Sequence, residues 1–171
     1  MKKLSLALFA TIVAVAIFSC SPKKGSTIES DPHVLGFSVD SSANINTVLA
    51  TIDDMAIYDS VSYKSKYVDT AFFNDNLSEM TIKENVSLIT KIKNLGVVLK
   101  LVKINAIWET NRNTPLRNSQ NFVHSIYTIS YTRDGKTVNN VVSQIDAFNK
   151  EGKIIEEWLF YDSSELKELM K

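Results

Sequence analysis

The spacing of hydrophobic and polar positions changes near the middle of the chain. In the first half, apolar side chains recur at intervals of three and four residues, which is typical of helices with one buried face. Thr81 and Glu84 match a capping box at the start of the last of these stretches, and Gly96 ends it. The predicted elements are helices over 43–58, 59–67 and 81–96 and a short strand over 69–75.

In the second half the period becomes two, which predicts β-strands. Asp134-Gly135 and Glu151-Gly152 mark turns between them. The predicted elements are strands over 97–109, 118–133, 137–149 and 153–161 and a short final helix after Asp162 or Ser163. Helices followed by a meander of long antiparallel strands indicate the α+β class.

The last predicted strand is apolar on both faces. One face carries Ile154, Trp158 and Phe160, and the other carries Ile155, Leu159 and Tyr161. In an antiparallel sheet with one solvated face, apolar and polar residues alternate along each strand more clearly than they do here. We therefore expect the helices to cover one face of the sheet and a second copy of the chain to cover the other, giving a homodimer through the sheet.

The N-terminus has the features of an export signal. Lys2 and Lys3 precede an uncharged run from Leu4 to Phe18, and this arrangement matches a secretory signal peptide. The run is shorter than the roughly 20 apolar residues of a membrane-spanning helix. The residues Ile17-Phe18-Ser19-Cys20 resemble the bacterial lipobox, which implies cleavage before Cys20 and lipidation of its thiol. The alternative is an ordinary signal peptide that ends in a cysteine.

This interpretation divides the chain into three parts. They are a lipoprotein signal peptide over 1–19, a flexible tether over 20–40 and one domain over 41–171. The expected location is the bacterial cell envelope, with the domain facing the periplasm and held to either the inner or the outer membrane by lipid on Cys20.

Composition excludes several classes of function. Cys20 is the only cysteine, so the domain has no disulfide, zinc-thiolate site or cysteine nucleophile. The chain has 19 basic and 19 acidic residues, without the basic patch of a nucleic-acid-binding protein. His33 and His124 lack metal-ligand spacing, and no phosphate-binding loop is present. We expect no metal, no cofactor and no nucleic acid.

Two segments carry a resemblance to a known family. Residues 67–75 (YVDTAFFND) and 146–158 (DAFNKEGKIIEEW) are similar to the strand entry and the last turn of the nuclear transport factor 2-like superfamily, which includes SnoaL-like proteins and ketosteroid isomerase. The resemblance covers roughly residues 43–165. It implies a strongly bent antiparallel sheet wrapped around the N-terminal helices, in a cone with a pocket at its open end.

The isomerase branch of this family implies one candidate residue. Asp75 falls on the position of its catalytic base, whereas the position of its oxyanion-binding tyrosine falls on Thr51. Because threonine is no equivalent acidic donor, the resemblance does not carry the isomerase reaction over. The alternative for Asp75 is a solvated turn residue.

His124 and Asp146 form a second candidate. Both lie on predicted strands with apolar neighbours, about 10 and 11 residues from the Asp134-Gly135 turn, so we expect them nearly opposite each other. A histidine beside a carboxylate can act as an acid/base pair. The alternatives are a core-edge histidine bonded to a carbonyl oxygen and an aspartate that faces solvent.

The aromatic residues supply candidate pocket walls. Tyr58, Trp108, Tyr127 and Trp158 are expected to line a largely apolar pocket, although aromatic side chains at strand spacing are also typical of a core. The favoured function is non-catalytic binding of a small apolar ligand or a partner. The alternatives are a SnoaL-like isomerase or cyclase that transfers a proton on a carbonyl compound, and a structural envelope component with a filled pocket.

Overall fold

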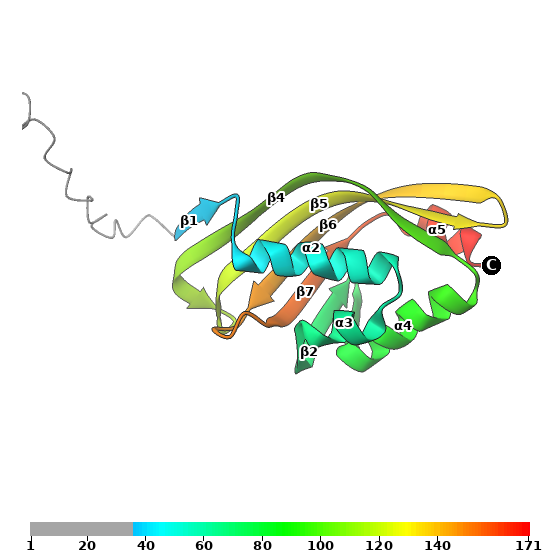
Figure 1. Cartoon of the computed structure of the whole chain (residues 1–171). Coiled ribbons are helices and arrows are strands. Elements are labelled where there is room, and N and C mark those ends of the chain that lie inside the picture. Colours follow the sequence, from blue (N-terminus) through cyan, green and yellow to red (C-terminus); the bar gives the residue numbers. More distant parts are fainter. Residues whose placement is uncertain (1–35) are drawn as a thin grey trace, which may run out of the picture. The chain divides into compact units, whose positions relative to one another are not determined.

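A computed structural model describes residues 36–171, which lie in one compact unit. The expected signal peptide, Cys20 and His33 lie outside the described residues. Seven strands form one curved sheet in the order β1-β4-β5-β6-β7-β2-β3 (Figure 1). Their bounds are β1 Gly36–Val39, β2 Tyr67–Asp75, β3 Ser78–Thr81, β4 Val98–Leu116, β5 Ser119–Arg133, β6 Lys136–Phe148 and β7 Ile154–Phe160.

The helices lie where the three- and four-residue spacing predicts them. They are α2 Ala43–Ala56, α3 Ser60–Ser65, α4 Ile82–Asn94 and α5 Ser164–Leu169. Thr81 and Glu84 form the predicted capping box at the start of α4, each side chain bonding the other's backbone N–H. None of the helices in residues 36–171 is long and apolar enough to cross a membrane. The α+β class is confirmed.

The sheet is mixed rather than wholly antiparallel, which corrects one detail of the prediction. β2 runs parallel to β7, with Phe73 opposite Glu157. A hairpin forces neighbouring strands to be antiparallel, but β2 and β7 are separated by α4 and four strands, so no turn sets their relative direction.

Two short strands were missed by the sequence pattern. β1 pairs with β4, with Gly36 opposite Arg112, so ordered structure begins within the expected tether and its boundary at residue 40 is corrected. A Cβ atom on Gly36 would lie 2.0 Å from the carbonyl oxygen of Asn111, so the close approach of β1 requires glycine. Four-residue strands such as β1 and β3 are too short to show a period of two.

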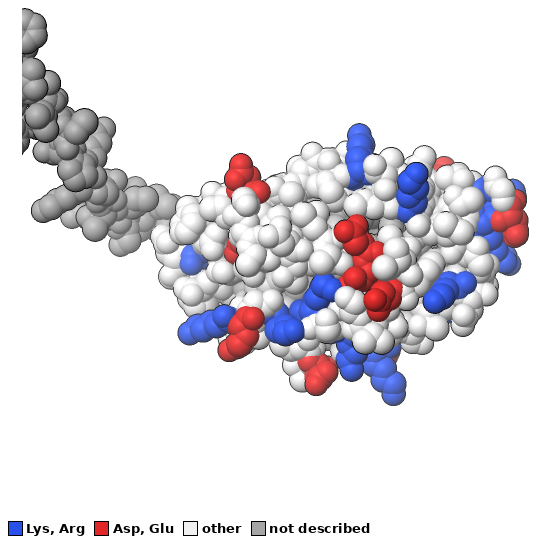
Figure 2. Space-filling model, viewed as in Figure 1, with Lys and Arg blue, Asp and Glu red and all other residues white. Residues whose placement is uncertain are grey.

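The core lies between the inner face of the sheet and the helices. Its fully buried members include Val48 and Ile52 of α2 and Phe73, Tyr127 and Ile129 of the sheet. Figure 2 shows basic and acidic side chains interspersed on the face viewed there, with no basic patch on that face.

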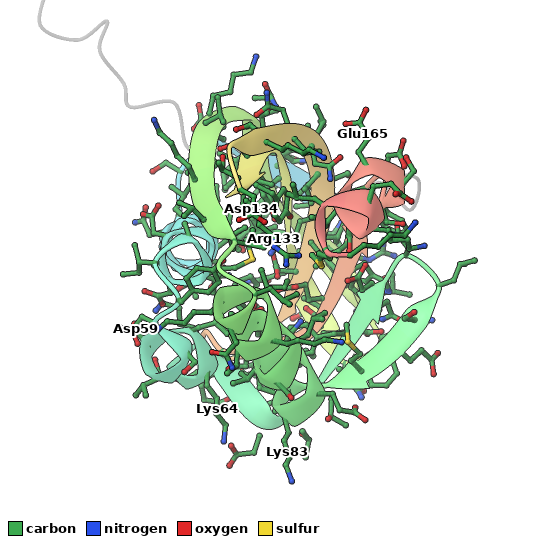
Figure 3. All side chains as sticks on the ribbon, turned by 90° about the vertical axis from the view of Figure 1, so that its right-hand side faces the viewer. Asp59, Lys64, Lys83, Arg133, Asp134 and Glu165 are labelled. Atoms are coloured by element: carbon green, nitrogen blue, oxygen red, sulfur yellow. The ribbon has the colours of Figure 1, made fainter. Side chains whose placement is uncertain are left out.

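One end of the unit is flanked by α4 and α5. Figure 3 looks onto this end, where Arg133 and Asp134 mark the hairpin between β5 and β6. The Arg133 guanidinium donates a hydrogen bond of 3.1 Å to the carbonyl oxygen of Leu169. This contact holds α5 against the hairpin.

Candidate functional site

A cavity of about 200 Å³ lies on the inner side of the sheet. Side chains from all four helices and from β2, β5, β6 and β7 line it. Its wall is mainly apolar, as in most small-molecule sites. The apolar residues of this wall include Ile52, Met55, Leu88, Ile89, Ile92 and Leu159.

A group of polar side chains interrupts the apolar wall on the sheet side. Tyr67, Tyr127, Gln144 and Glu157 come from four different strands, and Tyr63 comes from α3. All five line the cavity and all are buried. The four strand residues come together because each lies on the inner face of its strand.

Asp146 completes this group behind the cavity wall. It lies opposite Glu157 on the adjacent strand, and the Gln144 amide bridges the two carboxyl groups. The Gln144 amide donates to Oδ2 of Asp146 at 2.9 Å and to Oε2 of Glu157 at 3.3 Å. Asp146 is 0 % exposed and Glu157 is 3 % exposed. Two like charges this close and this deeply buried are unfavourable, so the environment favours keeping a proton on the pair.

The environment raises the pKa of both carboxyl groups. Burial raises the pKa of Glu157 to about 7, although hydrogen bonds from Tyr67 and Asp146 oppose the shift. Burial, and then the charge of Glu157, raise the pKa of Asp146 well above its usual range. Asp146 therefore holds its proton more tightly than an ordinary aspartate, and Glu157, which reaches the cavity, is the carboxyl group placed to exchange a proton with a bound molecule.

The tyrosines of the group act as donors. The Tyr67 hydroxyl donates to Oε2 of Glu157 at 2.5 Å, and the Tyr127 hydroxyl donates to Oε1 of Gln144 at 2.9 Å. The hydroxyl oxygens of Tyr63 and Tyr67 are 3.1 Å apart. Burial raises the pKa of all three hydroxyls well above the usual value, so they remain protonated, and Tyr67 orients the carboxylate directly.

Asp75, proposed from the family resemblance, also lines the cavity. The Tyr161 hydroxyl donates to its Oδ2 at 3.1 Å, and burial raises its pKa. Thr51, at the position of the isomerase tyrosine, lines the cavity as well, but its hydroxyl donates to the carbonyl oxygen of Val48 at 2.7 Å. Thr51 therefore has no hydrogen to offer a ligand.

The predicted pairing of His124 with Asp146 is wrong. His124 lies opposite Ile145, and Asp146 lies opposite Val123. This offset of one residue places the two side chains on opposite faces of the sheet. His124 instead stacks on Trp108 on the outer face, with ring centroids 5.0 Å apart, and burial lowers the pKa of its imidazole.

Only one of the four aromatic residues predicted to line the pocket does so. Tyr127 lines the inner cavity. Trp108 and Trp158 belong to the outer face, in one row with His124 across β4, β5, β6 and β7. Tyr58 donates a hydrogen bond of 2.6 Å to the carbonyl oxygen of Val97 and is not among the cavity-lining residues.

Glu157, Gln144 and Tyr67 were missed in the sequence, although a signal for Glu157 was present. Glu157 shares an otherwise apolar face with Ile155 and Leu159. A count outward from the turn that follows Phe148 would pair Asp146 with Glu156, because the register shift between Ala147 and Phe148 moves Glu157 opposite Asp146. The apolar face therefore marked Glu157 as unusual, but its pairing with Asp146 could not be found by counting.

No metal site emerges in residues 36–171, because no group of three or more His, Cys, Asp and Glu side chains there is placed to hold an ion. The polar group is instead a carboxyl pair with neutral donors, which suits proton transfer rather than metal binding.

No family model matches the sequence, and no curated protein matches it. Solved structures do match the fold over 74 % of the chain. AclR from Streptomyces galilaeus aligns at 13 % identity over 94 % of its length with a TM-score of 0.54. An LEH-like epoxide hydrolase from M. tuberculosis aligns at 15 % over 89 % with a TM-score of 0.55. PrhC from Penicillium brasilianum NBRC 6234 aligns at 9 % over 87 % with a TM-score of 0.56.

These likenesses, together with the helices packed on a strongly curved sheet, confirm the nuclear transport factor 2-like fold that the resemblance implied. Because this fold carries many unrelated activities, function has to be argued from the cavity.

Proposed function

We propose that the inner cavity is the active site of an enzyme that transfers a proton on a small, largely apolar substrate, with Glu157 as the base. The observation that supports this is the buried Asp146–Glu157 pair, because it places an exchangeable proton at the wall of an apolar cavity. A general base is most effective when its pKa lies near the working pH. Strongly perturbed acids in a cavity are also typical of functional sites.

Each polar residue has a defined role in this proposal. The Glu157 carboxylate takes a proton from a carbon next to a carbonyl group and returns it to another carbon of the same molecule, so no proton is gained or lost overall. Tyr67 and Gln144 both donate to Oε2 and fix the carboxylate. Asp146 is sealed from the cavity and is a positioning residue, since it sets the basicity of Glu157.

The test substrate is 3-cyclohexen-1-one, whose isomerisation to the conjugated ketone is followed by ultraviolet absorbance. We expect Glu157→Gln to lower kcat at least about 100-fold, which is the usual contribution of a general base. Glu156→Gln is the matched control, because Glu156 is the next residue on β7, faces the outer side and is bonded by Arg117 at 2.7 Å. Equal activity of the two variants would remove Glu157 from the mechanism.

A second candidate is the opening of an epoxide by water. Asp75 favours it, because a second carboxyl group with a raised pKa lines the same cavity, and one fold neighbour is an LEH-like epoxide hydrolase. Glu157 would take the proton of the attacking water, and Asp75 would give its proton to the ring oxygen as the carbon–oxygen bond breaks. The test substrate for this reaction is styrene oxide. If Asp75→Asn loses its hydrolysis but retains ketone isomerisation, the result supports epoxide opening with Asp75 as the acid.

Non-catalytic binding of a small apolar ligand was the function favoured by the sequence. It becomes the better proposal if the wild-type protein converts neither test substrate while both bind in the cavity, which a thermal shift would show through stabilisation by mass action.

A further inference from the structure

Asn85 of α4 adds a second polar contact to the cavity wall. It is 6 % exposed, it lines the cavity, and its side-chain carbonyl oxygen has no hydrogen-bond partner within residues 36–171. Leaving a buried acceptor unpaired costs about 1–3 kcal/mol. A buried amide in this state is expected to gain a partner when the cavity is occupied.

The neighbouring protein groups do not supply this partner. The helices and their caps also bring Thr51, Tyr63, Ser163 and Lys167 to the cavity wall, but none of them is hydrogen-bonded to the Asn85 carbonyl oxygen. Among the tyrosines of the cavity, Tyr127 donates to Gln144 and Tyr161 donates to Asp75. Within residues 36–171, the Asn85 carbonyl oxygen is therefore left unpaired at the cavity wall, where a bound molecule can supply the hydrogen.

We propose that Asn85 accepts a hydrogen bond from the ligand, so that the molecule held in this cavity is an apolar skeleton bearing a hydroxyl group. The hydroxyl binds at the wall formed by α4, and the reacting part of the molecule faces Glu157 on the sheet. This inference rests on the proposed function for the reacting end, but the contact to Asn85 concerns binding alone. A purely hydrocarbon ligand would leave the amide unpaired.

The test compares two probes of similar size, 2-naphthol, which can donate a hydrogen bond, and 2-methoxynaphthalene, which cannot. Affinities are measured by fluorescence titration of the full chain. We expect wild-type protein to bind 2-naphthol about 10-fold more tightly, the usual value of one hydrogen bond. Asn85→Leu should remove this preference while changing the affinity for 2-methoxynaphthalene less than about 2-fold.

Leu88→Met is the matched control, because Leu88 lines the same wall from the same helix and is apolar. It should keep the preference. The inference is overturned if Asn85→Leu keeps the preference, if both probes weaken equally, or if wild-type protein shows no preference. Unfolding of Asn85→Leu at lower temperature than wild type would also count against it, since an amide without an internal partner should not be needed for stability.

Glu157→Gln separates this inference from the proposed function. If it abolishes turnover and keeps the preference for 2-naphthol, both stand. If it is active and the preference still depends on Asn85, only the catalytic role fails. If the preference is lost in Glu157→Gln and kept in Asn85→Leu, the hydroxyl binds at the carboxyl pair and the inference about Asn85 fails.

Discussion

At the scale of single residues, the carboxyl pair is the most unusual feature of this protein. Asp146 and Glu157 are almost completely buried, yet within residues 36–171 no Lys or Arg forms an ion pair with either of them. Tyr67 and Gln144 offset part of the desolvation by neutral hydrogen bonds. The remaining cost appears as raised pKa values, which is the usual response of a buried acid.

This feature predicts how stability depends on pH. Because the native state holds the Glu157 proton up to about pH 7, whereas the unfolded chain releases it near pH 4.5, the native state binds more protons within this window. The free energy of unfolding should therefore fall as pH rises from 4.5 to 7. The total is at most about 3 kcal/mol, from 1.36 kcal/mol per pKa unit.

Urea unfolding of wild type and two variants at several pH values tests this. Glu157→Gln should show a shallower decline, because it removes one of the two raised carboxyl pKa values, and Glu156→Gln should follow wild type. A decline of the same steepness in Glu157→Gln would mean that Glu157 does not titrate in this window.

At the scale of elements, the sheet has one covered and one uncovered face in residues 36–171. The helices pack on the inner face, while the outer face carries the row of Trp108, His124, Ile145 and Trp158. A hollow of about 370 Å³ on this face is lined mainly by apolar and aromatic side chains, including Phe160, which is 47 % exposed. Exposed apolar patches often mark interaction sites.

The sequence-based expectation of a homodimer through the sheet is retained as a proposal on these grounds. We expect sedimentation velocity to show a dimer at micromolar concentration and Phe160→Lys to shift it to monomer, because a charge in an apolar interface is costly. Ile57→Lys, which changes a residue 71 % exposed at the end of α2, is the control. A wild-type monomer, or a Phe160→Lys dimer, would contradict the proposal.

At the scale of the whole molecule, the proposed location of the protein in the cell rests on residues that precede the described domain. The lipobox-like residues 17–20 lie outside the described part, so the lipid anchor remains a proposal from sequence. Several acyl chains at about 0.8 kcal/mol per buried methylene would hold the domain stably at a membrane. The cavity would then meet apolar molecules at the cell envelope.

Cys20→Ala is the direct test of this anchor. In bacteria, we expect wild-type protein in the membrane fraction, labelled by a fatty-acid analogue, and Cys20→Ala without label and with an uncleaved N-terminus. Ser21→Ala should behave as wild type, because it leaves the thiol intact. Label that persists in Cys20→Ala, or wild-type protein that is unlabelled and free in the cytosol, would rule the anchor out.

The sequence alone determined the class of fold and most of its elements, because helix and strand periods and caps such as Thr81–Glu84 are local properties of the chain. It also brought Asp75 and Tyr127 forward as candidates, and both line the cavity. It could not decide which acid faces which residue, because a change of one residue in strand register reverses the face of a side chain.

Tertiary structure decided the site. Register separated His124 from Asp146 and joined Asp146 to Glu157, and the parallel contact of β2 with β7 brought Tyr67 to the same carboxylate. These contacts link residues up to 90 positions apart in the chain, and no local pattern encodes such distances. The burial that shifts their pKa values is likewise a property of the assembled cavity.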